Sequence, residues 1–140
     1  MTFMTIFNVY GEPVPKKRPR FTRTGRTYTP KETMTYEAEV ARMAKSAMGS
    51  SEPLETPVAV YIYISMHVPA SYSAKRRDAC LRGFEKPIKK TGDIDNQIKT
   101  ILDGMNGIVY KDDCQVVSIH ATKKYDTVAL VNVFVKEELE

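Results

Sequence analysis

Two acidic pairs are the residues whose types and spacing could support catalysis. Asp93 and Asp95 flank a single residue, and Asp112 and Asp113 are adjacent. If the fold brings these carboxylates together, they repel one another unless cations neutralise them. Hard oxygen ligands with few histidines nearby favour Mg²⁺ or Mn²⁺, which bind through a couple of carboxylates and the phosphate oxygens of a substrate. The pattern therefore indicates a metal site suited to phosphate chemistry.

Each acidic pair also has a structural interpretation. Aspartate is among the best residues at a helix N-cap, so Asp93 or Asp95 alone could simply cap a helix. The pair Asp112-Asp113 is a common turn composition. Neither interpretation explains why two acidic pairs occur in a chain that also has two basic segments.

Lys99 lies four residues after Asp95, on the same face of the helix expected there. An ion pair within the helix, worth about 0.3 kcal/mol, is the simplest interpretation. The functional interpretation places the ammonium near the scissile phosphate or the attacking water, where it stabilises the negative charge of the transition state. Both interpretations remain open.

The positive charge is concentrated in two short segments. Residues 16–31 and residues 75–90 contain seven Lys or Arg each, out of 21 in the chain, while the net charge is only +4. Such segregation favours a polyanionic partner. A solvated surface is the alternative, although Phe21, Tyr28 and Phe84 are interleaved with the basic residues and could stack on unpaired bases.

The composition excludes several classes of protein. A length of 140 residues with 42% hydrophobic and 27% charged residues is typical of one soluble domain, here 1–140. There is no run of eighteen apolar residues and no export signal, so we expect a cytoplasmic protein without a membrane partner. Cys80 and Cys114 are far apart and have no histidine at ligand spacing, which argues against a zinc site or a disulfide.

The elements that must position these residues begin with a β-rich strand over 2–10, followed by an extended basic arm in which three prolines exclude a helix. Apolar residues at helical spacing predict a helix over 31–48, with Pro30 near its start and Gly49 at its end. The most apolar run, 58–68, predicts a strand in the centre of a sheet. A short helix is expected within 73–84.

A second long helix follows the acidic run and is expected to end at Asp103-Gly104. A short β-rich run at 108–110 comes next, and 115–124 and 127–135 are expected to form a hairpin around Tyr125-Asp126. The order predicts a mixed α/β (α+β) fold, with a single mixed β-sheet covered by helices.

These residues resemble the RusA-like crossover junction endodeoxyribonucleases, a family often carried by phages and prophages. The resemblance spans most of the chain, and its specific part is the acidic block. It rests on three motifs: Gly11-x-Pro13-x-Pro15-Lys16-x-Arg18-Pro19-Arg20 with Gly25-Arg26-x-Tyr28-Thr29-Pro30, Asp93-x-Asp95-Asn96-x-x-Lys99-x-x-x-Asp103-Gly104, and Asp112-Asp113-x-Gln115. One departure is that the segment between Val68-Pro69 and Asp93 is longer than in the shortest members.

The resemblance implies a homodimeric, Mg²⁺-dependent enzyme of DNA recombination and repair that resolves four-way (Holliday) DNA junctions by paired symmetric nicks. It implies that Asp93, Asp95 and Asp113 hold the metal and are catalytic together with Lys99, while Asp103 and Asp112 support them. Backbone phosphates are expected to bind basic residues of both segments, namely Lys16, Lys17, Arg18, Arg20, Arg23, Arg26, Lys75, Arg76, Arg77, Lys86, Lys89 and Lys90.

Two other hypotheses remain. The chain could be a non-catalytic DNA-binding protein whose acidic residues cap helices, which predicts binding without Mg²⁺-dependent cleavage. It could also be a structure-specific nuclease for flaps, forks or RNA. The sequence does not separate these substrates, because recognition of backbone shape depends on the geometry of a dimer.

Overall fold

The most apolar run of the chain forms an inner strand of a four-stranded sheet. β4 (Val58–His67) pairs in parallel with β5 (Val116–Asp126) and antiparallel with β6 (Leu130–Glu137), and β6 also pairs antiparallel with β1 (Met4–Tyr10). The strand order is therefore β1-β6-β4-β5. This computed structural model describes residues 3–16, 20–25, 27–28, 30–88 and 92–139. The single mixed sheet and the inner position of β4 confirm the sequence-based prediction.

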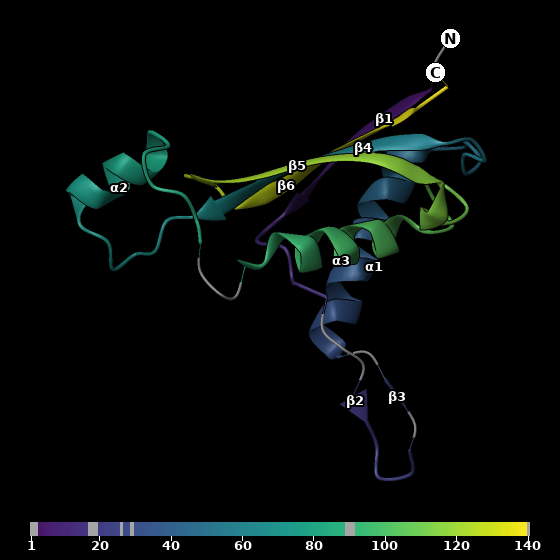
Figure 1. Cartoon of the computed structure of the whole chain (residues 1–140), viewed down its shortest axis with the longest axis horizontal. Helices are drawn as coiled ribbons and strands as arrows, with labels where there is room; N and C mark the ends of the chain where they lie inside the picture. The colour runs from purple at the N-terminus through teal and green to yellow at the C-terminus, as the bar shows by residue number, and fades with distance from the viewer. Residues whose placement is uncertain (1–2, 17–19, 26, 29, 89–91, 140) are drawn as a thin grey trace.

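Two helices cover one face of this sheet. α1 (Lys31–Met48) and α3 (Ile94–Met105) contact each other, and both lie on the same side of the strands (Figure 1). The core between the helices and the sheet consists of apolar side chains that are fully buried, among them Val9, Val40, Ile62, Ile101 and Val133. The predicted α+β architecture with helices packed on a sheet is therefore confirmed.

The predicted helix over 31–48 is present with the expected ends. Its N-cap residue is Pro30, and it stops at Gly49, whose φ of 59° lies in the left-handed region that glycine adopts without steric cost. The helix therefore has its whole predicted length, and its buried side includes Tyr36, Val40 and Ala44, while the element itself contacts α3 and β1.

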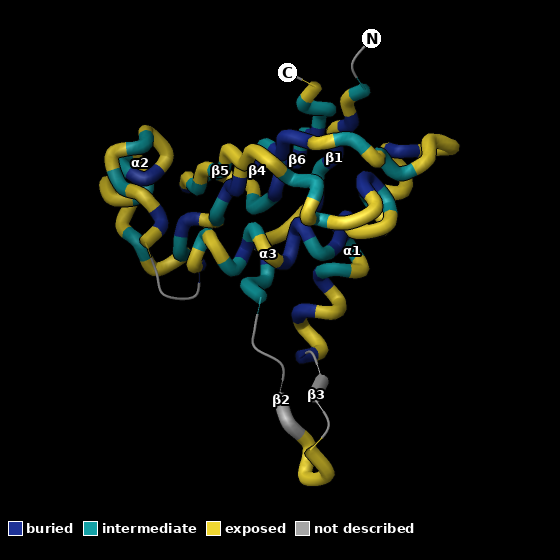
Figure 2. Tube along the Cα trace, turned by 45° about the vertical axis from the view of Figure 1, so that its right-hand side comes forward, coloured by how far each residue is buried: buried dark blue, intermediate teal, exposed yellow. Residues whose placement is uncertain are grey.

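The basic arm leads into a small hairpin that projects from the body beyond the start of α1 (Figure 1). β2 (Arg20–Phe21) pairs antiparallel with β3 (Thr27–Tyr28), and the turn passes through Gly25, whose N–H donates to Thr22 O at 3.0 Å. The residues of the turn are exposed (Figure 2). The sequence predicted an extended arm but not this pairing.

α2 (Ala74–Leu81) lies at the opposite end of the molecule from the chain termini and contacts β5 (Figure 1). Ser73 caps it, because its Oγ accepts a hydrogen bond from Arg76 N at 3.2 Å. Val68, Cys80 and Tyr125 form a small buried cluster beneath it. The short helix expected within 73–84 is confirmed.

The expected hairpin of the last two strands is wrong. β5 and β6 are adjacent in sequence, yet each pairs with β4 on opposite sides. Residues 127–129 cross from one side of β4 to the other, a gap of two strand spacings or about 10 Å, which three extended residues can span. β4 is the most apolar strand, its helix-facing side chains Val58, Val60, Ile62 and Ile64 are buried, and as an inner strand it satisfies backbone hydrogen bonds on both of its edges.

Two element boundaries also differ from the prediction. Residues 108–110 form no strand: only Tyr110 makes isolated bridges, to Leu54 and Asn106, although Val109 and Tyr110 are fully buried. α3 continues through Asp103 and Gly104 to Met105. Gly104 is therefore not a helix terminator, and a Cβ there would lie 2.6 Å from Val40 Cβ. Its role is to allow α1 and α3 to approach closely.

Candidate active site

One face of α3 carries three of the predicted site residues. Asp95, Lys99 and Asp103 follow one another at intervals of four residues, which places them on neighbouring turns of the same face. Asp95 and Lys99 are exposed, and Asp103 is half-buried. The helix therefore presents a stripe of alternating charge, with the cation in the middle.

Lys99 connects this helix with a separate segment of the chain. Its Nζ donates to Asp103 Oδ1 at 2.8 Å and to Asp113 Oδ2 at 3.1 Å. The hydrogen bond to Asp103, followed by the one to Asp113, raises the pKa of Lys99 above its ordinary value. The ion pair between Asp95 and Lys99 that the sequence suggested is not among the contacts of Lys99, which points toward its C-terminal neighbours.

A short turn fixes the position of Asp113. Asp113 begins the 3-10 helix Asp113–Gln115, and Gln115 anchors this turn by donating from Nε2 to Leu54 O at 2.8 Å and Thr56 O at 2.9 Å. Gln115 Oε1 also accepts from Asp112 N at 3.0 Å. The hydrogen bonds of Gln115 thus hold the turn that places the Asp113 carboxylate beside α3.

Asp112 lies next to Asp113 but has different partners. It is exposed, and hydrogen bonds from the Cys114 thiol and from Asp113 lower the pKa of its carboxyl. Asp112 therefore remains ionised within the turn, while Asp113 is the member of the pair that reaches Lys99.

Lys16 extends the charged network on the other side of Asp103. Its Nζ lies 2.6 Å from Glu37 Oε1 and 3.1 Å from Asp103 Oδ2, and its backbone N donates to Asn96 O at 2.8 Å. Burial opposes a rise in the pKa of Lys16, but the hydrogen bonds to Glu37 and Asp103 outweigh it and raise the pKa. Glu37 was not identified from the sequence, because no spacing relates a residue of α1 to one of α3.

Asp93 occupies the N-cap position of α3, but its carboxylate does not cap the helix. Its backbone has φ −61° and ψ 117°, and its carbonyl accepts from Gln97 N at 3.1 Å, while its side chain makes no cap hydrogen bond. Both Asp93 and Asp95 are exposed. The interpretation of Asp93 as a helix cap is therefore right about its position, but its carboxylate does not act as a cap.

The carboxylates of this face fit a hard divalent cation that is bound partly by the protein and partly by the phosphate oxygens of a substrate. Within the described ranges, no three side chains of Asp, Glu, His or Cys gather closely enough to hold a metal by themselves. Mg²⁺ commonly binds one or two carboxylates together with water and phosphate oxygens. Asp103 and Asp113 flank the Lys99 ammonium, and the exposed Asp95 lies one turn before Lys99 on the same face of α3, so this face provides carboxylates of this kind.

The predicted phosphate-binding residues that the structure describes have varied surroundings. Arg23, Lys75 and Lys86 are exposed, and Arg77 is half-buried. Arg76 binds Glu85 at 2.6 Å and lies over the Tyr72 ring, with Cζ 3.6 Å from its centroid. The remaining predicted positions lie outside the described residues or have no described side chain, namely Lys17, Arg18, Arg20, Arg26, Lys89 and Lys90.

The chain is similar in sequence to known proteins. Residues 10–136 match the family model of the endodeoxyribonuclease RusA. The uncharacterized protein YqaN of Bacillus subtilis (strain 168) is 34% identical over 136 residues, which cover 94% of each chain. Among the described helices, none combines the length and the hydropathy that crossing a membrane requires. On the extent of the family match, this chain belongs to the RusA endodeoxyribonuclease family.

Proposed function

We propose that this chain is a divalent-metal-dependent endonuclease that resolves four-way DNA junctions by paired nicks, in DNA recombination and repair in the cytoplasm. The observation that carries the proposal is the placement of Lys99 between Asp103 and Asp113, on the face of α3 that also bears Asp95. The membership of the chain in an endodeoxyribonuclease family supports phosphodiester hydrolysis as the chemistry.

The proposed roles follow from the charges and positions of these side chains. Asp93, Asp95 and Asp113 would hold Mg²⁺ or Mn²⁺. When bound, the cation supplies a water of lowered pKa and stabilises charge on the phosphate and the leaving oxygen. The Lys99 ammonium stabilises negative charge on the phosphate, and its raised pKa keeps it protonated well above neutral pH.

Asp103 and Lys16 are proposed to position Lys99. One carboxylate oxygen of Asp103 binds the Lys99 ammonium and the other binds the Lys16 ammonium. Lys16 also forms an ion pair with Glu37. This arrangement ties the active-site face of α3 to the basic arm, because Lys16 is the first basic residue of that arm. Lys16 is therefore better suited to fixing the base of the arm than to binding DNA by itself.

DNA binding is proposed to rely on the exposed basic residues of the two segments. Contacts from Lys and Arg to backbone phosphates give an affinity that falls steeply with salt concentration and carries little sequence information. A four-way junction has two scissile strands related by approximate two-fold symmetry. A homodimer with two identical active sites fits such a substrate.

The proposal is tested with a labelled four-way junction and a linear duplex of matched sequence, each incubated with and without Mg²⁺. Wild-type protein is expected to nick two opposed strands of the junction, and only with Mg²⁺. Asp93→Asn is expected to abolish cleavage while the free energy of unfolding changes by less than the ~1 kcal/mol typical of a lost N-cap, since the side chain makes no cap hydrogen bond.

Each alternative hypothesis predicts a different result. If wild type and Asp93→Asn both bind the junction and neither cuts it in Mg²⁺, the protein is a binding protein and the enzymatic proposal is wrong. If wild type cuts flaps or forks faster than junctions, the chemistry is retained and the proposed substrate is wrong.

A further inference from the structure

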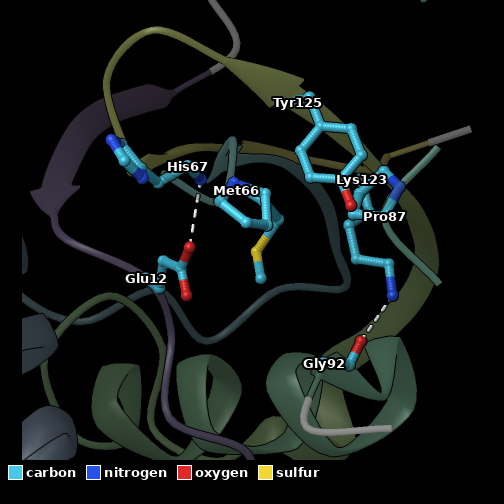
Figure 3. A pocket seen from close by; sticks show the side chains of 8 residues that line it. Glu12, Met66, His67, Pro87, Gly92, Lys123 and Tyr125 are labelled. Carbon is cyan, nitrogen blue, oxygen red and sulfur yellow. Dashed lines mark hydrogen bonds between the residues drawn. The ribbon is translucent and has the colours of Figure 1, made fainter. Parts of the chain in front are cut away.

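A cavity of about 290 Å³ lies beside the start of α3. Met66 and His67 line it from the end of β4, Lys123 and Tyr125 from the end of β5, and Glu12 and Gly92 close it from two connecting segments (Figure 3). This volume is near the lower end of the range for ligand pockets, which is about 300 to 1,000 Å³. The cavity therefore suits a small group better than an extended ligand.

The topology of the sheet makes this location a favourable binding position. β4 and β5 are the parallel pair of the sheet, and the cavity lies outside their carboxyl ends. In α/β units with parallel strands, ligands bind in this place. Gly92 directly precedes Asp93, so whatever occupies the cavity lies next to the proposed active site.

Opposite charges face each other across the cavity. Glu12 Oε1 accepts from His67 N at 3.0 Å, and Lys123 Nζ donates to Gly92 O at 2.5 Å (Figure 3). Each group can form further hydrogen bonds, since a carboxylate has a second oxygen and an ammonium has three donors. The walls between them include Met66, the ring of Tyr125 and two prolines, which present apolar atoms. A phosphate fits this arrangement poorly, because the Glu12 carboxylate repels it.

A buried amide with no partner adjoins the same position. Gln97 is 0% exposed, and neither Nε2 nor Oε1 has a hydrogen-bond partner among the described residues. A Cβ built on Gly92 would lie 3.7 Å from Gln97 Nε2 and 3.6 Å from both Lys123 Nζ and Met66 Cε. The amide, the ammonium and the methyl group thus converge on the residue that lines the cavity beside Asp93. Unpaired buried polar groups are uncommon and indicate a missing partner.

We propose that this cavity receives one unstacked nucleobase next to the scissile phosphate and favours a base that carries an amino group. The second oxygen of Glu12 accepts from the exocyclic amine, Lys123 donates to a base acceptor, and the Tyr125 side chain and Met66 pack against the ring. Thymine is disfavoured, because its one N–H donor is flanked by two carbonyl oxygens that a carboxylate repels. The proposal rests on the proposed nuclease function and adds a determinant of cleavage-site preference.

The test measures cleavage rates on a set of junctions in which each of the two nucleotides on either side of the cut is varied in turn. Wild type is expected to cut about tenfold more slowly when thymine occupies one of these positions, and at that position only. In Glu12→Gln, the side-chain oxygen still accepts from His67 N and the amide N–H₂ faces the base. The preference against thymine is therefore expected to disappear or reverse.

Glu52→Gln is the matched control, since it makes the same change at an exposed residue in the loop that precedes β4, at the opposite end of that strand from the cavity. It should retain the wild-type preference. If wild type cuts all junctions equally, or if Glu12→Gln retains the preference of wild type, the base pocket is wrong and the nuclease function stands. If wild type cuts no junction, the nuclease function is wrong.

A binding measurement tests the pocket without cleavage. 2-Aminopurine placed at the preferred position of an intact junction should become more fluorescent when wild type binds in the absence of Mg²⁺, because the base leaves the stack. Glu12→Gln should reduce this increase, while Glu52→Gln should not. Binding without any increase at the four positions would overturn the proposal.

Discussion

At the scale of single residues, Lys99 binds two carboxylates that its spacing from Asp95 did not predict. The interval of four residues correctly placed Asp95 and Lys99 on one face of α3, but Lys99 donates to Asp103 and Asp113 instead. The helical face was therefore predictable from spacing. The approach of Asp113 was not, since it depends on a turn that Gln115 ties to Leu54 and Thr56, and only the family resemblance pointed to it.

The raised pKa of Lys99 gives a prediction for the pH dependence of cleavage. Because the hydrogen bond to Asp103 raises this pKa, Lys99 stays protonated to higher pH than an isolated lysine. Asp103→Asn removes the charge and should move the alkaline limb of the pH–rate profile to lower pH. In Lys99→Arg the limb should vanish from the accessible range, since a guanidinium does not titrate there. Identical alkaline limbs in wild type and Asp103→Asn would contradict this role of Asp103.

At the scale of elements, the sequence correctly predicted the helices and strands whose apolar residues recur with a strong period. It failed to predict which strands pair, because pairing depends on residues far apart in the sequence. α1 and the inner strand β4 agree with their patterns of apolar residues. The hairpin was wrong because the short link between β5 and β6 resembles a hairpin turn, while the actual partner of both strands is β4. No local pattern shows that β4, an earlier strand, lies between β5 and β6, which follow one another in the sequence.

Gly104 illustrates the same limit within a helix. Glycine usually ends helices, yet here it lies inside α3 against Val40 and Glu37 of α1. This close approach also brings Glu37 to Lys16 and Asp103, a contact that no sequence pattern indicated. The packing of two helices and the position of the charged network therefore depend on one missing side chain.

Gly104→Ala is expected to destabilise the fold. The added Cβ would lie 2.6 Å from Val40 Cβ and 3.0 Å from Glu37 O, which forces the helices apart. Overpacking costs about 1–3 kcal/mol, and alanine returns up to about 1 kcal/mol through its helix propensity. Denaturant unfolding should show a net loss of about 1–2 kcal/mol. Ser46→Ala, on an exposed position of α1, is the control and should be nearly neutral. Wild-type stability in Gly104→Ala would show that the helices are not held this closely.

At the scale of the whole molecule, the proposed active site is on an open surface between two cationic parts of the chain. The basic arm ends in a hairpin that projects beyond α1, and α2 with its basic segment lies at another extremity (Figure 1). A branched DNA molecule is large enough to contact both. Two such surfaces related by a two-fold axis would offer one active site to each scissile strand.

Mixed dimers test this symmetric arrangement. Wild-type chains mixed and refolded with an excess of tagged Asp95→Asn chains should form dimers with one intact site. Such dimers are expected to nick only one strand of each junction. Native and denaturing gels run in parallel separate these nicked junctions from resolved products. Wild type mixed with tagged wild type is the control and should give paired nicks. Full resolution by dimers with a single intact site, or a monomeric active species in sedimentation, would contradict the two-site dimer.

The composite active site is tested most directly by comparing Asp113→Asn with Asp112→Asn in single-turnover cleavage of a four-way junction at saturating Mg²⁺. The two substitutions are chemically identical and adjacent, but only Asp113 contacts Lys99. Asp113→Asn is expected to lower the cleavage rate by about a hundredfold or more, and Asp112→Asn by less than about tenfold, with junction binding retained in both. Wild-type cleavage by Asp113→Asn, or an equal loss in both variants, would contradict an active site in which Asp113 joins the acidic face of α3.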